Sequence, residues 1–141
     1  MTTNNYEVAS HCSHCSKPII KHYFSLRRIT EVCDFYPSSR KSVVECELLS
    51  LDEIAEYCSE SCLDLALEAA MSEEGIPLTQ EAPDMSPVER CSACGAEVDM
   101  RGFHTIYQIE KIELWRFGMR DPEWCDPIAI VCIHCAPGED C

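Results

Sequence analysis

The chain has 141 residues, of which twelve are cysteines, and its formal net charge at pH 7 is -14. A chain of this length forms one domain or two small ones, and each half lies near the size at which an apolar core alone is marginal and metals or disulfides add stability. The acidic balance argues against a general nucleic-acid-binding protein, which should be basic.

The sequence shows no sign of export or of membrane insertion. The first residues are polar, and His11–Lys17 is cysteine-rich where a secretory signal needs an apolar core. The longest strongly apolar stretch, Ile128–Ile133, is far too short to span a bilayer. We therefore expect a soluble cytoplasmic protein without membrane contact, in a reducing compartment where close cysteine pairs bind metal more often than they form disulfides.

Eight cysteines form four close pairs, and these pairs organise the chain. The pairs are Cys12 with Cys15, Cys58 with Cys62, Cys91 with Cys94, and Cys132 with Cys135. Between the second and third pairs, glycine and prolines occur among acids and small polar residues, as in linkers. We predict a zinc module over residues 1–74, an acidic linker over residues 75–89 and a second zinc module over residues 90–141.

The first half predicts a hairpin followed by a helix. Tyr23–Val32 and Lys41–Leu49 are rich in β-branched and aromatic residues, with a turn-forming Pro-Ser-Ser between them. From Glu60 to Ser72, apolar residues recur at helical spacing, Ser59 is a candidate N-cap, and Gly75 ends the segment.

The second half predicts strands only. Gly102–Phe117 and Ile128–Ile133 have strand character, and the turn-prone Asp121–Pro122 and Asp126–Pro127 should interrupt them. Ala136–Gly138 breaks the chain directly after the last cysteine pair. The fold class expected is a small, metal-stabilised α+β protein, with a hairpin and helix in the first half and a mostly-β ribbon in the second.

The two halves also resemble a diverged duplication. Tyr23 to Leu26, followed by Ile29, has a counterpart in Ile106 to Ile109, followed by Ile112. The spacing within the two segments is the same, which suggests an internal repeat.

We predict that each half holds one structural zinc ion. A C-x-x-C turn brings two sulfurs to one ion, and a second pair completes a tetrahedral shell. Cys12 and Cys15 should join Cys58 and Cys62, where the positive end of a helix dipole favours thiolate. The four cysteines of the second half should form the other site, closing on a turn instead of a helix.

Tyr57–Leu63 reads Tyr-Cys-Ser-Glu-Ser-Cys-Leu. This segment resembles the closing motif of treble-clef zinc fingers of the MYM and TRASH type, with Cys12–Cys15 as the opening knuckle. The resemblance covers about residues 11–72 and implies a knuckle, hairpin and helix around zinc, in families known mostly for protein contacts or metal sensing. Residues 91–135 resemble a zinc ribbon in the broad sense.

Other uses of the cysteines stay open at this point. The pairs can instead form disulfides, a redox dithiol or the ligands of an iron–sulfur cluster. A neighbouring histidine can replace a cysteine ligand, the candidates being His11, His14 and His134. The cysteines without a close partner are predicted to be buried and not to be ligands, although they could form a third site: Cys33, Cys46, Cys125 and Cys141.

The predicted function is a non-enzymatic protein-interaction module or adaptor. Four thiolates close the shell that catalytic zinc keeps open, and the sequence has neither a phosphate-binding glycine loop nor a deaminase signature. Residues 42–99 carry fifteen acids and one arginine. Such an acidic surface suits a basic partner, and an inhibitor of a nucleic-acid-binding protein, of the kind that phages and mobile elements encode, is one form of it. The candidate contact residues are Glu45, Glu47, Asp52, Glu53, Glu56, Glu60, Asp64 and Trp124.

Three alternatives accompany this prediction. The acids can simply form a solvated surface and a linker. The N-terminal module can bind nucleic acid, combining phosphate contacts with base stacking through Lys17, Lys21, Arg27, Arg28, Arg40 and Lys41, interleaved with Tyr23, Phe24, Phe35 and Tyr36. The chain can also be a dithiol redox or metal-sensing protein.

Overall fold

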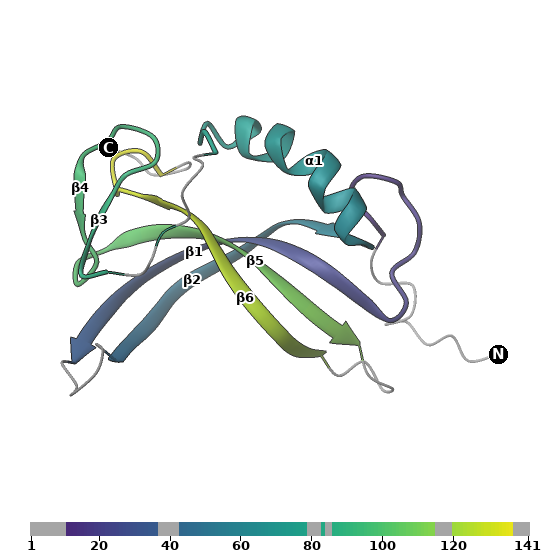
Figure 1. Ribbon diagram of the computed structural model, residues 1–141, viewed down its shortest axis with the longest axis horizontal. Helices are drawn as coiled ribbons and strands as arrows, with labels where there is room; N and C mark the ends of the chain where they lie inside the picture. Colours follow the sequence, from purple (N-terminus) through teal and green to yellow (C-terminus); the bar gives the residue numbers. More distant parts are fainter. Residues whose placement is uncertain (1–10, 37–42, 79–82, 84–85, 115–119, 137–141) are drawn as a thin grey trace.

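The computed structural model describes residues 11–36, 43–78, 83, 86–114 and 120–136 as a small α+β fold that is mostly antiparallel sheet (Figure 1). Its elements are β1 (His22–Tyr36), β2 (Val43–Tyr57), α1 (Glu60–Glu73), β3 (Val88–Arg90), β4 (Glu97–Asp99), β5 (His104–Leu114) and β6 (Arg120–Val131). In the described part of the chain, no helix combines the length and apolar character needed to cross a membrane.

Both halves of the chain contribute to one sheet. The strand order is β2-β1-β5-β6, and all three pairings are antiparallel. The long strands curve strongly, α1 lies over one face, and the short β3-β4 pair lies at one end (Figure 1). The two predicted modules therefore share a sheet, and their contact is the central β1–β5 pairing.

The two segments of the suspected repeat pair with each other at the centre of this sheet. Leu26 lies opposite Ile109, while Tyr23 lies opposite Ile112 and Ile29 opposite Ile106. The first residue of each segment therefore pairs with the last residue of the other. This reciprocal register is the one that an approximate two-fold axis through the Leu26–Ile109 pair produces.

Strand β6 differs from the prediction because it runs through both Asp-Pro sequences. The expected interruption is wrong. Register shifts in the β5–β6 pairing lie beside the prolines, which are opposite Gln108 and Ile112. A proline has no backbone N–H for the ladder, and edge strands and bulges tolerate it best. The prolines therefore bend the edge strand without ending it.

The helix follows the prediction closely and ends in a Schellman motif. The Ile76 N–H donates to the Met71 carbonyl (3.0 Å), and the Gly75 N–H donates to the Ser72 carbonyl (3.0 Å). Gly75 has a φ of 78°, a left-handed conformation that glycine adopts without a Cβ penalty. Met71 and Ile76 are both buried in the main core, so the cap also anchors the chain that follows the helix.

The end of α1 is tied to both halves of the sheet. The Glu74 carboxylate accepts from Arg28 Nη1 of β1 and from Tyr107 Oη of β5, each at 2.8 Å. Burial raises the pKa of Tyr107, and the hydrogen bond to Glu74 adds to this effect, so the hydroxyl keeps its proton as a donor. Residues from both halves form the main apolar cluster, among them Leu26 and Ile130. The helix thus packs on a core that neither half builds alone.

Candidate metal centres

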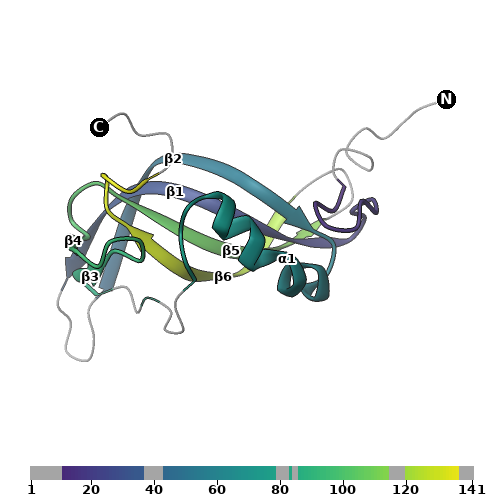
Figure 2. The same ribbon diagram turned by 90° about the horizontal axis from the view of Figure 1, so that it is seen from above.

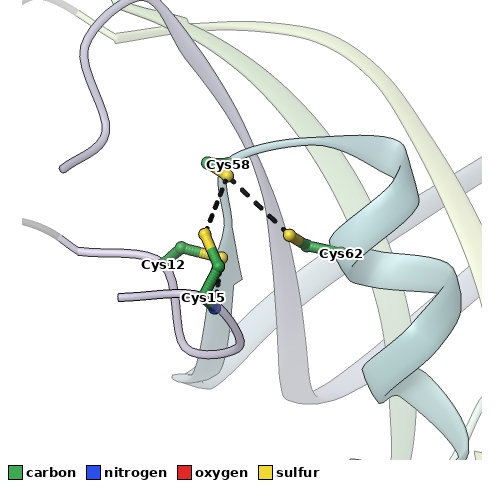
Figure 3. Close-up of side chains that lie close together, drawn as sticks. All are labelled: Cys12, Cys15, Cys58 and Cys62. Carbon is green, nitrogen blue, oxygen red and sulfur yellow. Dashed lines mark hydrogen bonds between the residues drawn. The ribbon is translucent and has the colours of Figure 1, made fainter. Parts of the chain in front are cut away.

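The first predicted tetrad is assembled in the structure. Cys12 and Cys15 lie in the loop before β1, Cys58 follows β2, and Cys62 is in the first turn of α1 (Figure 3). The Cys58 Sγ lies 3.5 Å from Cys15 Sγ and 3.9 Å from Cys62 Sγ, and all four sulfurs lie within 4.8 Å of one another. A tetrahedral zinc ion with Zn–S bonds of about 2.3 Å separates its sulfurs by about 3.8 Å. The four thiols therefore fit one ion.

Backbone hydrogen bonds shape the first knuckle. The Cys12 N–H donates to the Lys17 carbonyl (2.8 Å), and the Ser16 N–H donates back to the Cys12 carbonyl (3.0 Å). Ser16 adopts a φ of 67° to close this turn. The Ser13 N–H donates to the Glu56 carbonyl (2.7 Å), which ties the knuckle to the end of β2. The turn and the strand together aim both pairs of sulfurs at one point.

The helix N-terminus positions the fourth ligand. Ser59 has an extended backbone, and its Oγ accepts from the Cys62 N–H at 3.1 Å, so the predicted N-cap is confirmed. The cap satisfies a backbone N–H that the first turn leaves without a helical partner. The sequence therefore orients Cys62 through an ordinary capping interaction.

The second predicted tetrad is also assembled. Cys91 and Cys94 lie between β3 and β4, and Cys132 and Cys135 follow β6. Cys94 Sγ lies 3.8 Å from Cys132 Sγ, and the four sulfurs lie within 4.8 Å of one another. The Cys135 N–H donates to the Cys132 carbonyl (3.0 Å), so this pair closes on a turn as predicted.

The second knuckle repeats the hydrogen bonds of the first. The Cys91 N–H donates to the Ala96 carbonyl (2.8 Å), and the Gly95 N–H donates to the Cys91 carbonyl (2.9 Å). Gly95, with a φ of 78°, takes the place that Ser16 has in the first knuckle. The Ser92 N–H donates to the Ile130 carbonyl (2.8 Å).

The tie between knuckle and strand also has the same position in both centres. Its acceptor residues, Glu56 and Ile130, each stand two residues before the third ligand, Cys58 or Cys132. A shared plan of this kind supports a common origin of the two halves. The centres lie at opposite ends of the sheet, one where β2 meets α1 and one beside β3 and β4 (Figure 2).

One thiol in each tetrad is set up to ionise first. Burial alone would raise the pKa of Cys12, but hydrogen bonds from backbone amides, including those of Cys15 and Cys58, lower it to about 6. Burial opposes ionisation of Cys91 as well, and the amides of Cys132 and Cys94 lower its pKa to about 6. Each centre therefore offers a thiolate at neutral pH to begin metal binding.

Other thiols of the two tetrads have a raised pKa. Burial and hydrogen bonds to neighbouring sulfurs raise the pKa of Cys58 to about 12. The hydrogen bond to Cys132 raises the pKa of Cys135, and burial adds to it. Because a thiol must lose its proton to become a metal ligand, a divalent ion displaces the protons of Cys58 and Cys135 when it binds.

The ligand atoms of each tetrad restrict which metal ion or cluster can bind there. Each tetrad offers four sulfurs and no other ligand among the described residues, so His11, His14 and His134 are outside both. Tetrahedral thiolate sites suit zinc or a single iron. A four-iron cluster needs thiolates spread over four separate metal atoms, which the close packing of these sulfurs does not provide. The tetrads can therefore each hold a single metal ion.

The predicted acidic contact residues lie mostly along β2. Glu45, Glu47, Asp52 and Glu53 are exposed there, and Glu56 is half-buried. Glu60 and Asp64 are exposed on α1. Asp52 pairs with Arg28 at 3.1 Å, and Glu53 accepts from Ser25 Oγ at 2.6 Å and lies 3.9 Å from Arg27 Nη2. The last predicted contact residue, Trp124, lies in β6 opposite Lys111, and its side chain is outside the described part.

The groups expected to contact nucleic acid are largely used internally. Arg27 pairs with Glu110 at 2.8 Å, and Arg28 pairs with two carboxylates. Tyr23 and Phe24 are buried, which removes their rings from base stacking. Lys17 and Lys21 are exposed and Phe35 is half-buried, whereas Arg40, Lys41 and the Tyr36 side chain lie outside the described residues.

Two cysteines without a close partner in the sequence are brought together by the fold. Cys33 and Cys46 lie directly opposite in the β1–β2 hairpin and form a disulfide. The signal was the hairpin itself, because residues at similar distances from a turn face each other across an antiparallel pair. We predicted that the isolated cysteines are buried and are not ligands. Cys33 is buried, but Cys46 and Cys125 are exposed, so the predicted burial is wrong for these two. Cys125 is a free thiol in β6, and Cys141 lies outside the described residues.

No family model, curated protein or solved structure matches this chain. The metal centres are therefore supported by the distances between their sulfurs and by the hydrogen bonds that position them.

Proposed function

We propose that the chain is a non-enzymatic protein-interaction module, held together by two structural zinc ions, which binds a basic partner segment along the free edge of β2. The observation that carries this proposal is an edge strand of fifteen residues that exposes both leucines and acids. Exposed apolar residues that follow one another on an edge strand are unusual, because such edges invite pairing with other chains.

The exposed leucines give the edge its affinity. Leu48 is 54% exposed, Leu49 46% and Leu51 40%. An extended segment added to β2 would cover these side chains and pair with backbone groups that face away from β1. Main-chain hydrogen bonds and apolar contact together favour binding of an extended strand.

The acids select the partner. Glu45 and Glu47 precede the leucines and make no ion pair with another described residue, while Asp52 and Glu53 are partly neutralised by Arg28 and Arg27. A basic segment would therefore be attracted to the Glu45–Glu47 end of the strand. An inhibitor that occupies the basic surface of a nucleic-acid-binding protein is one form that this function takes.

The other edge of the sheet is less suited to strand addition. Pro122 and Pro127 lie in β6, and each lacks the N–H that an added strand would need as a donor. The two edges therefore differ, and β2 is the better docking edge.

The zinc ions in this proposal are structural. Four thiolates leave no ligand position for water or substrate, which separates such sites from catalytic zinc. A treble-clef-like arrangement in residues 11–72 and a ribbon-like one around β3 and β4 are the finer assignments we propose for the two centres. They would hold the curved sheet in the shape that presents β2.

Site-specific crosslinking tests the docking edge. A photo-crosslinkable residue replaces Leu49 on β2 or, as a matched probe, Leu65, which is 71% exposed on α1. We expect the Leu49 probe to capture the same lysine- or arginine-rich segment of a partner reproducibly, with capture falling as salt rises. The Leu65 probe should not capture that segment.

A charge control separates specific contact from overall charge. Glu45→Gln with Glu47→Gln should weaken capture, whereas the exposed pair Glu68→Gln with Glu97→Gln, which removes the same charge elsewhere, should leave it unchanged. Equal loss in both variants would show that only net charge matters. Capture by Leu65 as strong as by Leu49 would place the partner surface elsewhere.

A further inference from the structure

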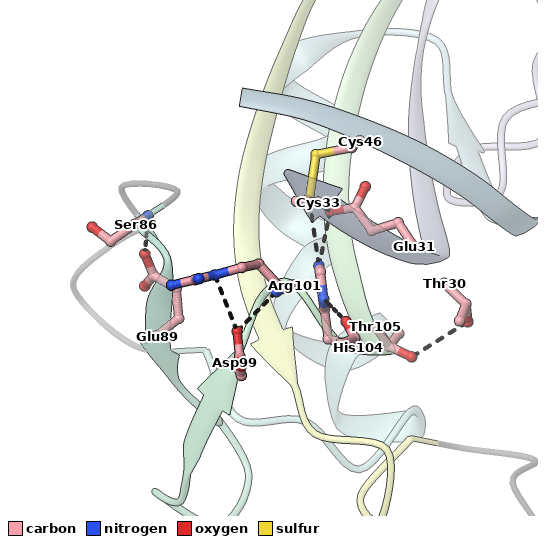
Figure 4. A network of polar contacts seen from close by, with 11 residues as sticks. Thr30, Glu31, Cys33, Cys46, Ser86, Glu89, Asp99, Arg101, His104 and Thr105 are labelled. Atoms are coloured by element: carbon pink, nitrogen blue, oxygen red, sulfur yellow. Dashed lines mark hydrogen bonds and ion pairs between the residues drawn. A yellow bond between two sulfur atoms is a disulfide. The ribbon is translucent and has the colours of Figure 1, made fainter. Parts of the chain in front are cut away.

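A third group of metal-ligating side chains lies away from both tetrads. Cys33 and Cys46 face each other across β1 and β2 with their Cα atoms 4.1 Å apart. Glu31 of β1 and His104 of β5 lie beside Cys33 (Figure 4). Three strands thus bring two sulfurs, a carboxylate and an imidazole together.

The histidine is held in the tautomer that a metal ligand requires. His104 Nδ1 lies 2.9 Å from the Gly102 carbonyl oxygen, which can only accept, so Nδ1 carries the proton. In a neutral ring Nε2 is then an acceptor, yet it lies 2.9 Å from Glu31 Oε2, which is another acceptor. Only a proton fits between two atoms this close, so the pair is a hydrogen-bonded ion pair here, and a bound metal ion would replace that proton and move the two atoms apart. Histidines that bind metal typically donate their other N–H to a carbonyl in this way.

The distances suit a single small ion. Cys33 Sγ lies 3.2 Å from Glu31 Oε2 and 3.9 Å from His104 Nε2. The ligand atoms of Glu31, Cys33 and Cys46 all lie within 4.8 Å of one another. Tetrahedral zinc with bonds of about 2.0 to 2.3 Å spaces its ligands by roughly 3.3 to 3.8 Å. Reduction of the disulfide lets the two sulfurs separate to this spacing, and His104, which is outside the 4.8 Å group, completes the shell by moving toward Cys46.

The carboxylate and the imidazole are buried as a hydrogen-bonded pair. His104 is 1% exposed and Glu31 7%, so a polar pair lies in the interior beside a buried sulfur. The site is still reachable, because Cys46 is exposed on β2. A surface hollow of about 250 Å³, lined by His104 with Phe103 and Ile133, gives a second approach.

We propose that Cys33, Cys46, Glu31 and His104 form a third metal site, for zinc or a similar borderline transition metal, when the two cysteines are reduced. The disulfide is the oxidised state of this site. When hydrogen peroxide oxidises the two metal-bound thiolates, one S–S bond forms and the O–O bond breaks, two electrons pass from sulfur to the peroxide, and two protons from solvent complete two molecules of water. The disulfide then no longer supplies thiolate ligands, so the ion is released.

Metal counting by native mass spectrometry tests this site. The full chain, kept reduced and supplied with zinc, should carry three ions. Cys46→Ser should carry two, because it removes one ligand from the third site and none from the tetrads. Cys125→Ser is the matched control: it removes a free thiol of β6 that belongs to none of the three groups, and it should keep three ions.

A second variant separates loss of a ligand from loss of the fold. Glu31→Gln keeps the size of the side chain, and it should weaken binding of the third ion at least tenfold while both tetrads stay loaded. With cobalt, the third ion should show weaker sulfur-to-metal absorption per ion than the tetrads, because only two thiolates bind it. The proposal fails if the reduced wild-type chain carries only two ions while alkylation shows that Cys33 and Cys46 are both free thiols.

Discussion

Each knuckle depends on one residue with positive φ. Ser16 and Gly95 occupy equivalent places, with φ values of 67° and 78°. Only glycine adopts this conformation without a penalty, so the first knuckle carries strain that the second does not. In Ser16 the strain is maintained by the hydrogen bonds between Cys12 and the residues that follow it.

Substitution of Gly95 should therefore cost stability through the backbone alone. A Cβ at Gly95 would meet no atom within 4 Å, so Gly95→Ala adds no clash. We expect the free energy of unfolding of the zinc-loaded chain to fall by about 1 kcal/mol, the typical cost of a left-handed alanine. Denaturant titration measures the change.

Gly102→Ala is the control for this prediction. Its added Cβ would lie 3.5 Å from the Asp99 carbonyl oxygen, an ordinary contact, and no positive φ is involved. Its effect should stay within about 0.5 kcal/mol. If both variants lost the same free energy of unfolding, the positive φ of Gly95 would not be the cause of the loss.

At the scale of elements, the N-cap of α1 also positions Cys62, the fourth cysteine of the first centre. The Ser59 side chain satisfies the Cys62 N–H, and Cys62 supplies a sulfur one helical turn from the cap. The second centre closes on a turn and has no equivalent cap. Loss of the cap should therefore weaken metal binding at the first centre and leave metal binding at the second centre unchanged.

Ser59→Ala tests this separation. Loss of the cap should destabilise α1 by about 1 kcal/mol and weaken metal binding at the first centre. In a chelator titration followed by native mass spectrometry, one ion should leave earlier than in the wild type and the other at the same chelator concentration. Ser61→Ala, at an exposed position of the same turn, should leave the titration unchanged, and an identical shift in both variants would contradict the role of the cap.

At the scale of the whole molecule, the β1–β5 pairing couples the two centres. Ten residue pairs join these strands, from His22–Glu113 to Glu31–His104. Glu74 adds a second connection through Arg28 and Tyr107. Because structural zinc in small domains contributes about 10 to 16 kcal/mol to folding, loss of one ion should reach across this contact.

Cys15→Ser tests the coupling. The variant should lose the first ion, and amide hydrogen exchange should speed up in β5 as well as in β1 and β2, because β5 loses an ordered neighbour. Cys125→Ser, with an intact tetrad, provides the reference. If exchange in β5 and β6 stays at the wild-type rate in Cys15→Ser, the halves fold as independent modules.

The sequence by itself determined the two tetrads through the cysteine spacing, and it determined the capped helix and the difference between the two closing pairs through the residues beside those cysteines. The C-x-x-C turns and the helix caps depend on contacts within a few residues, whereas each tetrad joins two cysteine pairs that are about forty residues apart in the chain. The spacing of Tyr23 and Ile29 against Ile106 and Ile112 also indicated a repeat before any strand pairing was known.

Only the tertiary structure decided how the two halves pack together and which of the isolated cysteines lie next to each other. The β1–β5 pairing and the approach of His104 to Glu31 join residues that are far apart in the chain, and their register depends on the curvature and bulges of the whole sheet. Local propensity carries no information about that register. The third group of ligands is therefore visible in the fold and hidden in the sequence.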